Sequence, residues 1–297
     1  MPTENQPASP SISLNEHSQP GITVTPLAPV PLDPNNPPWG LGGAVMVLLG
    51  SIVLQIVFSI LFFVPYLYHL SLRQDAPANL IGFALTDKTA ILLQVISLLP
   101  AHLFSLTLVW AVVTRFGKLP FLASLGLMWS GQLRFWGSVG LGIVLCVVGS
   151  GIAWLLGGGK PTQLDEIVNS SLAARYVLAA LAVFTAPLVE ELIYRGVLYS
   201  ALHRLVGSST AVIIVLGVFT LIHVPQYRSN VGVIAAVGLL SICLTIIRAY
   251  TGRLLPCVVI HLVFNGIQAI VMVVEPHLPK LAPASEQAAG MLLRLSS

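Results

Sequence analysis

Two adjacent glutamates and an arginine stand out in a stretch of the chain that otherwise carries no charge. Glu190, Glu191 and Arg195 are the only charged residues between positions 176 and 202. An ionisable side chain near the centre of a membrane helix costs about 2.5–3.5 kcal/mol, so a functional explanation is the default. A structural ion cluster that locks helices together is the alternative. Three ionisable residues within six positions favour a functional site.

Helical spacing gives the two glutamates different tasks. Glu191 and Arg195 are four residues apart, in the order that favours a carboxylate–guanidinium pair on one helix face. Glu190 points about 100° away from its neighbour, where Arg195 cannot serve it equally well. Glu190 is therefore the carboxylate left free to face a site, where it could act as a general base.

Two later apolar stretches carry further polar motifs. Phe219 precedes His223 by one helical turn, and His261 precedes Asn265 by the same spacing. Residues with this spacing share a helix face. His261 and Asn265 thus place two polar side chains on one face of the apolar run 254–274, which is hard to explain as packing alone.

Isolated histidines in apolar stretches have a simpler interpretation. Such a residue is more often structural, with its ring nitrogens satisfied by neighbours. We assign that role to His69 and His102, and His223 alone would receive it too. The motifs that accompany His223 favour a site instead.

The depth of the polar residues within their helices predicts that they meet. At a rise of about 1.5 Å per residue, Glu190 lies about 18 Å and His223 about 22 Å from helix ends at one membrane face. His261 and Asn265 lie about 12 and 18 Å from helix ends at the same face. We therefore expect the four side chains to converge in one cavity inside the membrane.

Composition places these helices in a membrane. Of the 297 residues, 56% are hydrophobic and only 8% are charged, whereas soluble domains carry about 25% charged residues. This balance excludes a cytosolic enzyme, a disordered protein and a nucleic-acid binder, and it favours a multi-spanning membrane protein. Apart from Glu190, Glu191 and Arg195, the charged residues are expected in connections and tails.

Seven apolar runs are long enough to cross a membrane, for which roughly 20 residues are needed. They are residues 41–69, 90–114, 135–159, 176–202, 205–227, 229–247 and 254–274. Each is expected to be a helix, because backbone groups in lipid must be satisfied within the segment, and barrel strands would be shorter and alternating. The stretch 119–133 is too short to span. The predicted fold class is an all-α, polytopic transmembrane helix bundle of about 7–8 spans with an intramembrane polar cavity.

The ends of the chain differ from this bundle. Residues 1–38 hold 10 of the 21 prolines and no lysine or arginine, a composition typical of disorder. We predict a disordered proline-rich tail over 1–38 and a transmembrane helical domain over 39–275. The motif-bearing core covers 175–275, and a short carboxy-terminal tail covers 276–297.

The three motifs together resemble the signature of the CPBP family. These are the CAAX-protease and bacteriocin-processing intramembrane proteases, also called the Abi family, and they include the type II CAAX prenyl endopeptidases. The resemblance rests on Glu190-Glu191-x-x-x-Arg195, Phe219-x-x-x-His223 and His261-x-x-x-Asn265, with no departure in the motif residues. It covers about residues 175–268, roughly a third of the chain.

The resemblance implies a bundle of about eight helices around a conical cavity, and an intramembrane endopeptidase. Glu190 would activate water, and His223 would assist it. His261 and Asn265 would polarise the scissile carbonyl or form an oxyanion hole, as peptide hydrolysis requires. Three neighbouring residues would hold the motifs in place: Glu191, Arg195 and Phe219.

A metal requirement is left open by the sequence. Glu190, His223 and His261 could bind Zn²⁺ with an open position, as a hydrolytic zinc site requires. The chain lacks the H-E-x-x-H motif of the usual zinc helix. The family is often described as metalloproteases, yet its CAAX members resemble glutamate-dependent enzymes that need no bound metal.

Partners and alternatives follow from the same features. We expect contact with membrane lipid and with a peptide or lipid-modified protein substrate, no nucleic acid, and a multi-pass location in the plasma (inner) membrane of a prokaryote. The main alternative is a non-catalytic immunity or binding membrane protein that uses the same cavity. A proton-coupled transporter is a weaker alternative, since the halves of the chain show no internal repeat of the kind common in transporters.

Overall fold

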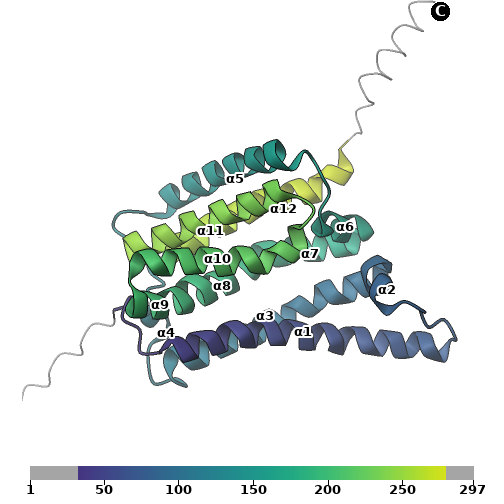
Figure 1. The fold of residues 1–297 in the computed structure, drawn as a ribbon, viewed down its shortest axis with the longest axis horizontal. Coiled ribbons are helices and arrows are strands. Elements are labelled where there is room, and N and C mark those ends of the chain that lie inside the picture. Colours follow the sequence, from purple (N-terminus) through teal and green to yellow (C-terminus); the bar gives the residue numbers. More distant parts are fainter. Residues whose placement is uncertain (1–32, 279–297) are drawn as a thin grey trace, which may run out of the picture. The chain divides into compact units, whose positions relative to one another are not determined.

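Helices make up all the regular structure in the part of the chain that the structure describes, residues 33–278 of a computed structural model. Six of them are long and apolar enough to cross a membrane. They are α1 (Leu41–Leu72), α3 (Lys88–Thr114), α5 (Phe135–Gly157), α10 (Ser208–Tyr227), α11 (Val231–Thr251) and α12 (Leu255–Val274) (Figure 1). The predicted all-α polytopic bundle is confirmed.

A bent series of helices carries the first motif and makes a seventh crossing if it is counted as one span. It consists of α7 (Leu172–Phe184), α8 (Ala186–Glu190), the π-helical η1 (Glu191–Leu198) and α9 (Tyr199–Val206). The bend between its two halves measures 40°. Pro187 lies in the first turn of α8, where a missing backbone N–H leaves no hydrogen bond unmade. If these segments are counted as one span, the total becomes seven, the number of apolar runs in the sequence.

Short helices fill the connections. They are α2 (Leu80–Thr86), α4 (Phe121–Leu125), α6 (Gln163–Ser170) and the single turn η2 (Glu275–His277). The predicted short stretch 119–133 contains only α4, so residues 33–278 contain no eighth span. A capping box between Thr162 and Asp165 fixes the start of α6.

Glycines let the helices of the second half approach closely. α11 packs between α5 and α10, while α12 packs against α5 and α7 (Figure 1). A Cβ added at Gly232 of α11 would lie 2.5 Å from the Ala153 carbonyl oxygen of α5. One added at Gly142 of α5 would lie 2.8 Å from the Val263 Cβ of α12. Small residues at such crossings are how membrane helices gain close packing.

The segment before α1 is tied to the rest of the bundle. Residues 33–38 fall within the predicted disordered tail; residues 1–32 of that tail, and 279–297 of the carboxy-terminal one, lie outside the described part of the chain. Three arginines donate hydrogen bonds to backbone carbonyls here: Arg115 to Pro38, Arg204 to Pro37, and Arg248 to Pro34. The Trp39 indole N–H donates to the Val197 carbonyl of η1 at 3.1 Å. The segment thus contacts the helix that carries the first motif.

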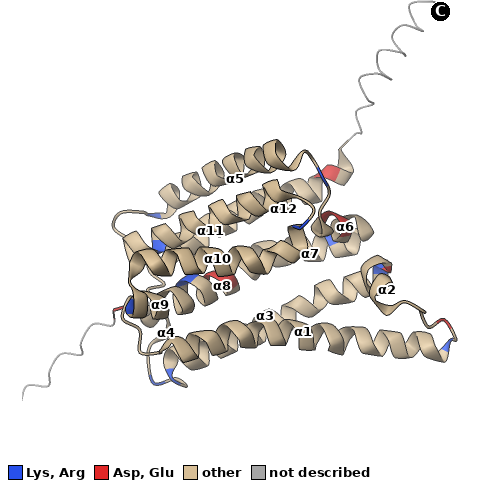
Figure 2. Ribbon diagram, viewed as in Figure 1, with Lys and Arg blue, Asp and Glu red and all other residues tan. Residues whose placement is uncertain are grey.

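Two arginines expected in connections are buried within helices instead. Charged residues mostly gather at helix ends, with a group of both signs beside α8 (Figure 2). However, Arg248 lies in α11 with no exposed surface, and Arg175 lies in α7 at 6% exposure. Arg175 donates to the Met272 carbonyl and to Glu275, which joins the start of α7 to the end of α12. These contacts offset part of the cost of burying Arg175. Arg248 has no carboxylate partner within residues 33–278, and its Nε makes no hydrogen bond there.

The glycine crossing makes a prediction about stability. Gly232→Ala puts a methyl group against the backbone of α5, and we expect it to lower the free energy of unfolding by about 1–3 kcal/mol through overpacking. Thermal unfolding in detergent micelles measures the loss. Gly151→Ala is the matched control, because its Cβ meets nothing within 4 Å and alanine favours a helix. Equal melting temperatures for the two variants would contradict the close crossing.

Candidate active site

A fully buried ion pair lies at the centre of the site. The side chains of Glu191 and Arg195 have no exposed surface, and Arg195 Nη1 donates to Glu191 Oε1 at 2.9 Å. The pair predicted from the four-residue spacing is therefore present. It lies within η1, whose first following residue, Tyr199, donates its backbone N–H to the Tyr194 carbonyl five positions back.

Arg195 also contacts two other helices. Nη2 donates to the carbonyl and hydroxyl oxygens of Ser241 at 3.1 and 3.0 Å, and Nε donates to Thr245 Oγ1 at 3.3 Å. Both partners lie on α11. The guanidinium carbon also lies 4.5 Å from the centre of the Phe219 ring of α10, a cation–π contact. Arg195 therefore holds η1 against α10 and α11, and Phe219 has a definite supporting contact.

Glu191 also holds the third motif. Its Oε1 accepts a second hydrogen bond, from His261 Nδ1 of α12 at 2.8 Å. A carboxylate can only accept, so Nδ1 carries the hydrogen, and in the neutral ring Nε2 is left as an acceptor. That Nε2 lies 3.8 Å from Glu190 Oε2, beyond hydrogen-bonding distance. One carboxylate thus orients both Arg195 and His261.

The ring of His223, in the second motif, is held in the same way as that of His261. His223 Nδ1 donates to the Phe219 carbonyl at 2.7 Å, because a carbonyl oxygen can only accept. Its ring lies 4.5 Å from the Phe219 ring, centre to centre. Nε2 of neutral His223 is therefore also an unprotonated acceptor, and it is held by contacts within α10.

Asn265 links α12 to the bent crossing. Its Nδ2 donates to the Ala182 carbonyl at 3.0 Å, one of the last carbonyls of α7. Carbonyls in the final turn of a helix lack intrahelical partners. An amide nitrogen carries two hydrogens, so one N–H of Asn265 remains for a ligand.

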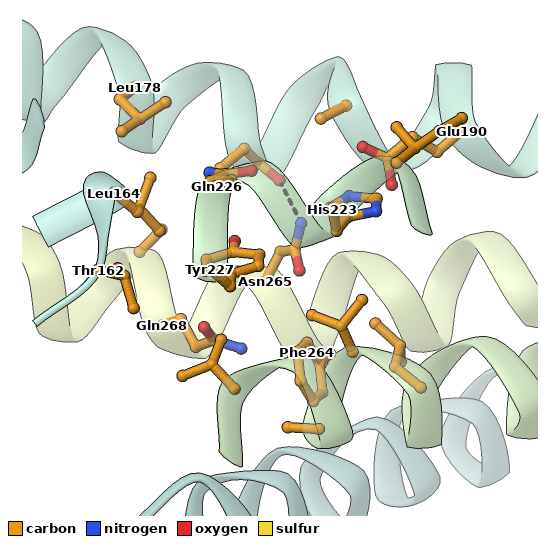
Figure 3. Close-up of a pocket in the computed structure, with 18 of the residues that line it drawn as sticks. Thr162, Leu164, Leu178, Glu190, His223, Gln226, Tyr227, Phe264, Asn265 and Gln268 are labelled. Carbon is orange, nitrogen blue, oxygen red and sulfur yellow. Dashed lines mark hydrogen bonds between the residues drawn. The ribbon is translucent and has the colours of Figure 1, made fainter. Parts of the chain in front are cut away.

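All four predicted side chains line one cavity of about 890 Å³: Glu190, His223, His261 and Asn265. Figure 3 shows Glu190 and His223 toward one end of the pocket and Thr162 and Leu164 toward the other. The structure thus brings together the residues whose depths in the helices predict convergence.

Other polar residues also line the cavity. They include His102, to which the sequence assigns a structural role, and six residues for which the sequence suggests no role: Thr162, Asn169, Tyr194, Gln226, Tyr227 and Gln268. Gln226 follows His223 by three residues and Gln268 follows Asn265 by three, so each continues its motif's helix face. That spacing is a signal that could have identified the two glutamines. His102 and Tyr194 have no such neighbour in the sequence.

The three proposed zinc ligands do not gather as a metal site. Within residues 33–278, no group of three His, Cys, Asp or Glu side chains is placed to hold a metal ion. Nε2 of His261 and Oε2 of Glu190 are close, but His223 does not complete a ligand set with them. The arrangement of these donors does not fit a three-ligand zinc site.

Comparison with known proteins agrees with the three motifs. Residues 172–267 match the family model described as type II CAAX prenyl endopeptidase Rce1-like. The match runs from the first residue of α7 past Asn265, and it confirms the family resemblance and supports a CAAX-type intramembrane protease. Neither the curated proteins nor the solved structures that were compared give a match.

The contribution of the buried ion pair to stability can be tested with two variants, one that removes only the carboxylate and one that removes both charges. Glu191→Ala leaves the Arg195 guanidinium uncompensated, so we expect a loss of about 3–5 kcal/mol in the free energy of unfolding. The double variant Glu191→Ala/Arg195→Met should recover part of this, because no buried charge remains. Thermal unfolding in detergent measures both.

A second ion pair provides the comparison for this test. Glu275 pairs with the buried Arg175 at 3.0 Å, but the Glu275 side chain is 68% exposed. Glu275→Ala should cost less than Glu191→Ala, because Arg175 keeps its hydrogen bonds to the Val168 and Met272 carbonyls and to Asn169. A double variant less stable than Glu191→Ala would show that the guanidinium does not depend on this carboxylate.

Proposed function

We propose that the chain is an intramembrane endopeptidase in which Glu190 activates the attacking water. The observation that carries this proposal is the contrast between two neighbouring carboxylates. The Glu191 side chain is fully buried and hydrogen-bonded to Arg195 and His261, whereas the Glu190 side chain is 25% exposed and faces the cavity. Only Glu190 is free to exchange a proton with a cavity water.

The first step is attack on the peptide carbonyl. Glu190 takes a proton from water, and the water oxygen forms a bond to the carbonyl carbon. The carbonyl oxygen then becomes an oxyanion, which needs hydrogen-bond donors already in place. The second N–H of Asn265 can supply one. His261 supplies another from Nε2 when that atom has bound a proton from solvent before the attack, since Nδ1 is held by Glu191.

The second step is loss of the amine. The carbon–nitrogen bond breaks, the oxyanion returns to a carbonyl, and the leaving nitrogen receives the proton that Glu190 took from water. His223 assists this transfer, because its Nδ1–H is fixed on the Phe219 carbonyl and its Nε2 can accept and return a proton. The four side chains that take part in these two steps all line the cavity: Glu190, His223, His261 and Asn265.

The substrate we propose is a membrane-associated peptide, of CAAX type or another sequence, in the plasma membrane of a prokaryote. The cavity volume lies within the range of pockets that hold small ligands or a few residues of peptide. The helices around it form a multi-pass integral membrane protein, so a lipid-anchored or membrane-embedded substrate can reach the site within the bilayer.

Replacing the proposed base tests the mechanism. Glu190→Gln removes the proton acceptor and keeps the shape of the side chain. We expect cleavage of a farnesylated CAAX reporter peptide, by protein in nanodiscs, to fall by at least about 10²–10⁴-fold, the usual contribution of a general base. The melting temperature should stay close to that of the unchanged protein, because Glu190 is not part of the buried pair.

Glu166→Gln is the matched control for this variant. Glu166 is an exposed acid in α6, so its removal should leave cleavage unchanged. Full cleavage by Glu190→Gln would contradict the mechanism. Peptide binding without cleavage in the unchanged protein would favour the non-catalytic binding protein, and substrate flux into liposomes would favour the transporter.

Zinc dependence makes a separate prediction. Because the donors do not form a three-ligand set, we expect purified protein to contain well under one zinc per chain and to keep its activity after chelation. Metal analysis and reporter cleavage before and after treatment with a chelator measure both. Stoichiometric zinc whose removal abolishes cleavage would overturn this prediction.

A further inference from the structure

A third histidine reaches the cavity from a helix outside the three motifs. His102 lies in α3, is 6% exposed and lines the same cavity as Glu190. Its Nδ1 lies 2.7 Å from Thr185 Oγ1, whose hydroxyl donates to the Leu181 carbonyl at 3.2 Å. The single hydroxyl hydrogen of Thr185 is therefore engaged, so Nδ1 of His102 is the donor between the two side chains. In the neutral ring, Nε2 then carries no hydrogen.

The Nε2 atom of His102 is open to the cavity. Within residues 33–278 this atom makes no hydrogen bond. It keeps some exposed surface, because it is absent from the fully buried side-chain atoms that lack a partner. Buried polar groups are almost always hydrogen-bonded. An acceptor that faces a polar cavity in this way is a binding position for water.

The three cavity histidines share one arrangement. Each uses its Nδ1–H on a protein acceptor: Thr185 for His102, the Phe219 carbonyl for His223, and Glu191 for His261. Each leaves Nε2 toward the cavity. A purely structural histidine would have both ring nitrogens satisfied by protein, which is the role that the sequence suggests for His102. The structure instead gives His102 the geometry of the two histidines in the motifs.

His102 is also connected to Glu190. The α3 helix packs against α8 and η1, and His102 and Glu190 line the same cavity. Thr185 is the residue at the bend, immediately before the helix that ends at Glu190. The Nδ1–H of His102 therefore holds the bend, while its Nε2 lies on the cavity side.

We propose that His102 is a positioning residue for Glu190: its Nδ1–H fixes Thr185 at the bend, and its Nε2 accepts a hydrogen bond from a cavity water that also donates to the Glu190 carboxylate. This role rests on the proposed function of Glu190 as the base. By fixing one water next to the carboxylate, His102 limits the orientations of the group that must deprotonate the attacking water. Misplacement of a reacting group by about 1 Å can cost 10²-fold in rate.

Two substitutions separate the halves of this role. The amide nitrogen of His102→Asn takes the place of Nδ1, so it keeps the bond to Thr185 and removes the cavity acceptor. The longer amide of His102→Gln reaches the position of Nε2. We expect kcat for the reporter peptide to fall about 10–100-fold in His102→Asn, with KM and melting temperature nearly unchanged, and to recover partly in His102→Gln. His69→Asn, at an exposed position of α1, is the control and should match the unchanged protein.

A measurement without turnover tests the link to Glu190 directly. Histidine labelled with ¹⁵N in the ring, in nanodisc samples, reports the protonation of each nitrogen by NMR. We expect the signal assigned through its loss in His102→Asn to show a protonated Nδ1 and an unprotonated Nε2, and the Nε2 signal to shift in Glu190→Gln. Unchanged kcat in His102→Asn, or an Nε2 signal that does not move in Glu190→Gln, would overturn the proposal. Failure of the proposed function appears separately, as full cleavage by Glu190→Gln.

Discussion

The carboxylate of Glu191 is the constraint on which the rest of the site depends. It has no exposed surface, and one of its oxygens accepts hydrogen bonds from both Arg195 and His261. A charge buried this deeply is tolerated only when it is paired and hydrogen-bonded. Pairing this oxygen, Oε1, requires η1 and α12 to meet at one place, and Arg195 extends the requirement to α10 and α11. The other oxygen, Oε2, has no hydrogen-bond partner within residues 33–278.

The bent crossing turns this constraint into an open site. A straight helix would continue the hydrogen bonding of α7 through residues 185–187, but the chain bends by 40° there and then continues as π-helix. The bend leaves the last carbonyls of α7 to other donors, and Asn265 satisfies one of them. Wider π-helical turns are frequent at functional sites. Here the altered turn begins between Glu190 and Glu191, which keeps one carboxylate in the protein interior and the other beside the cavity.

Much of this arrangement could be predicted from the sequence, and the limits have physical causes. The scarcity of charged residues predicts the membrane bundle. The four-residue spacing predicts the pairing of Glu191 with Arg195, because this pairing depends only on the geometry of one helix. The bond from His261 to Glu191 joins residues 70 positions apart, so no spacing within a helix encodes it. Arg248 lies four residues from a glycine turn and looks like a connection residue. Its burial depends on the segment before α1, whose carbonyls accept its hydrogen bonds only in the folded bundle.

The need for two adjacent glutamates follows from the incompatible demands on them. A carboxylate that organises Arg195 and His261 has to stay ionised and engaged, since protonation or movement would leave the guanidinium unpaired in the bundle. A carboxylate that acts as a base has to gain and lose a proton in each turnover and keep contact with water. No single side chain can satisfy both demands. Adjacent positions on one helix resolve the conflict, because a rotation of about 100° separates the environments of the two groups while the backbone fixes the distance between them.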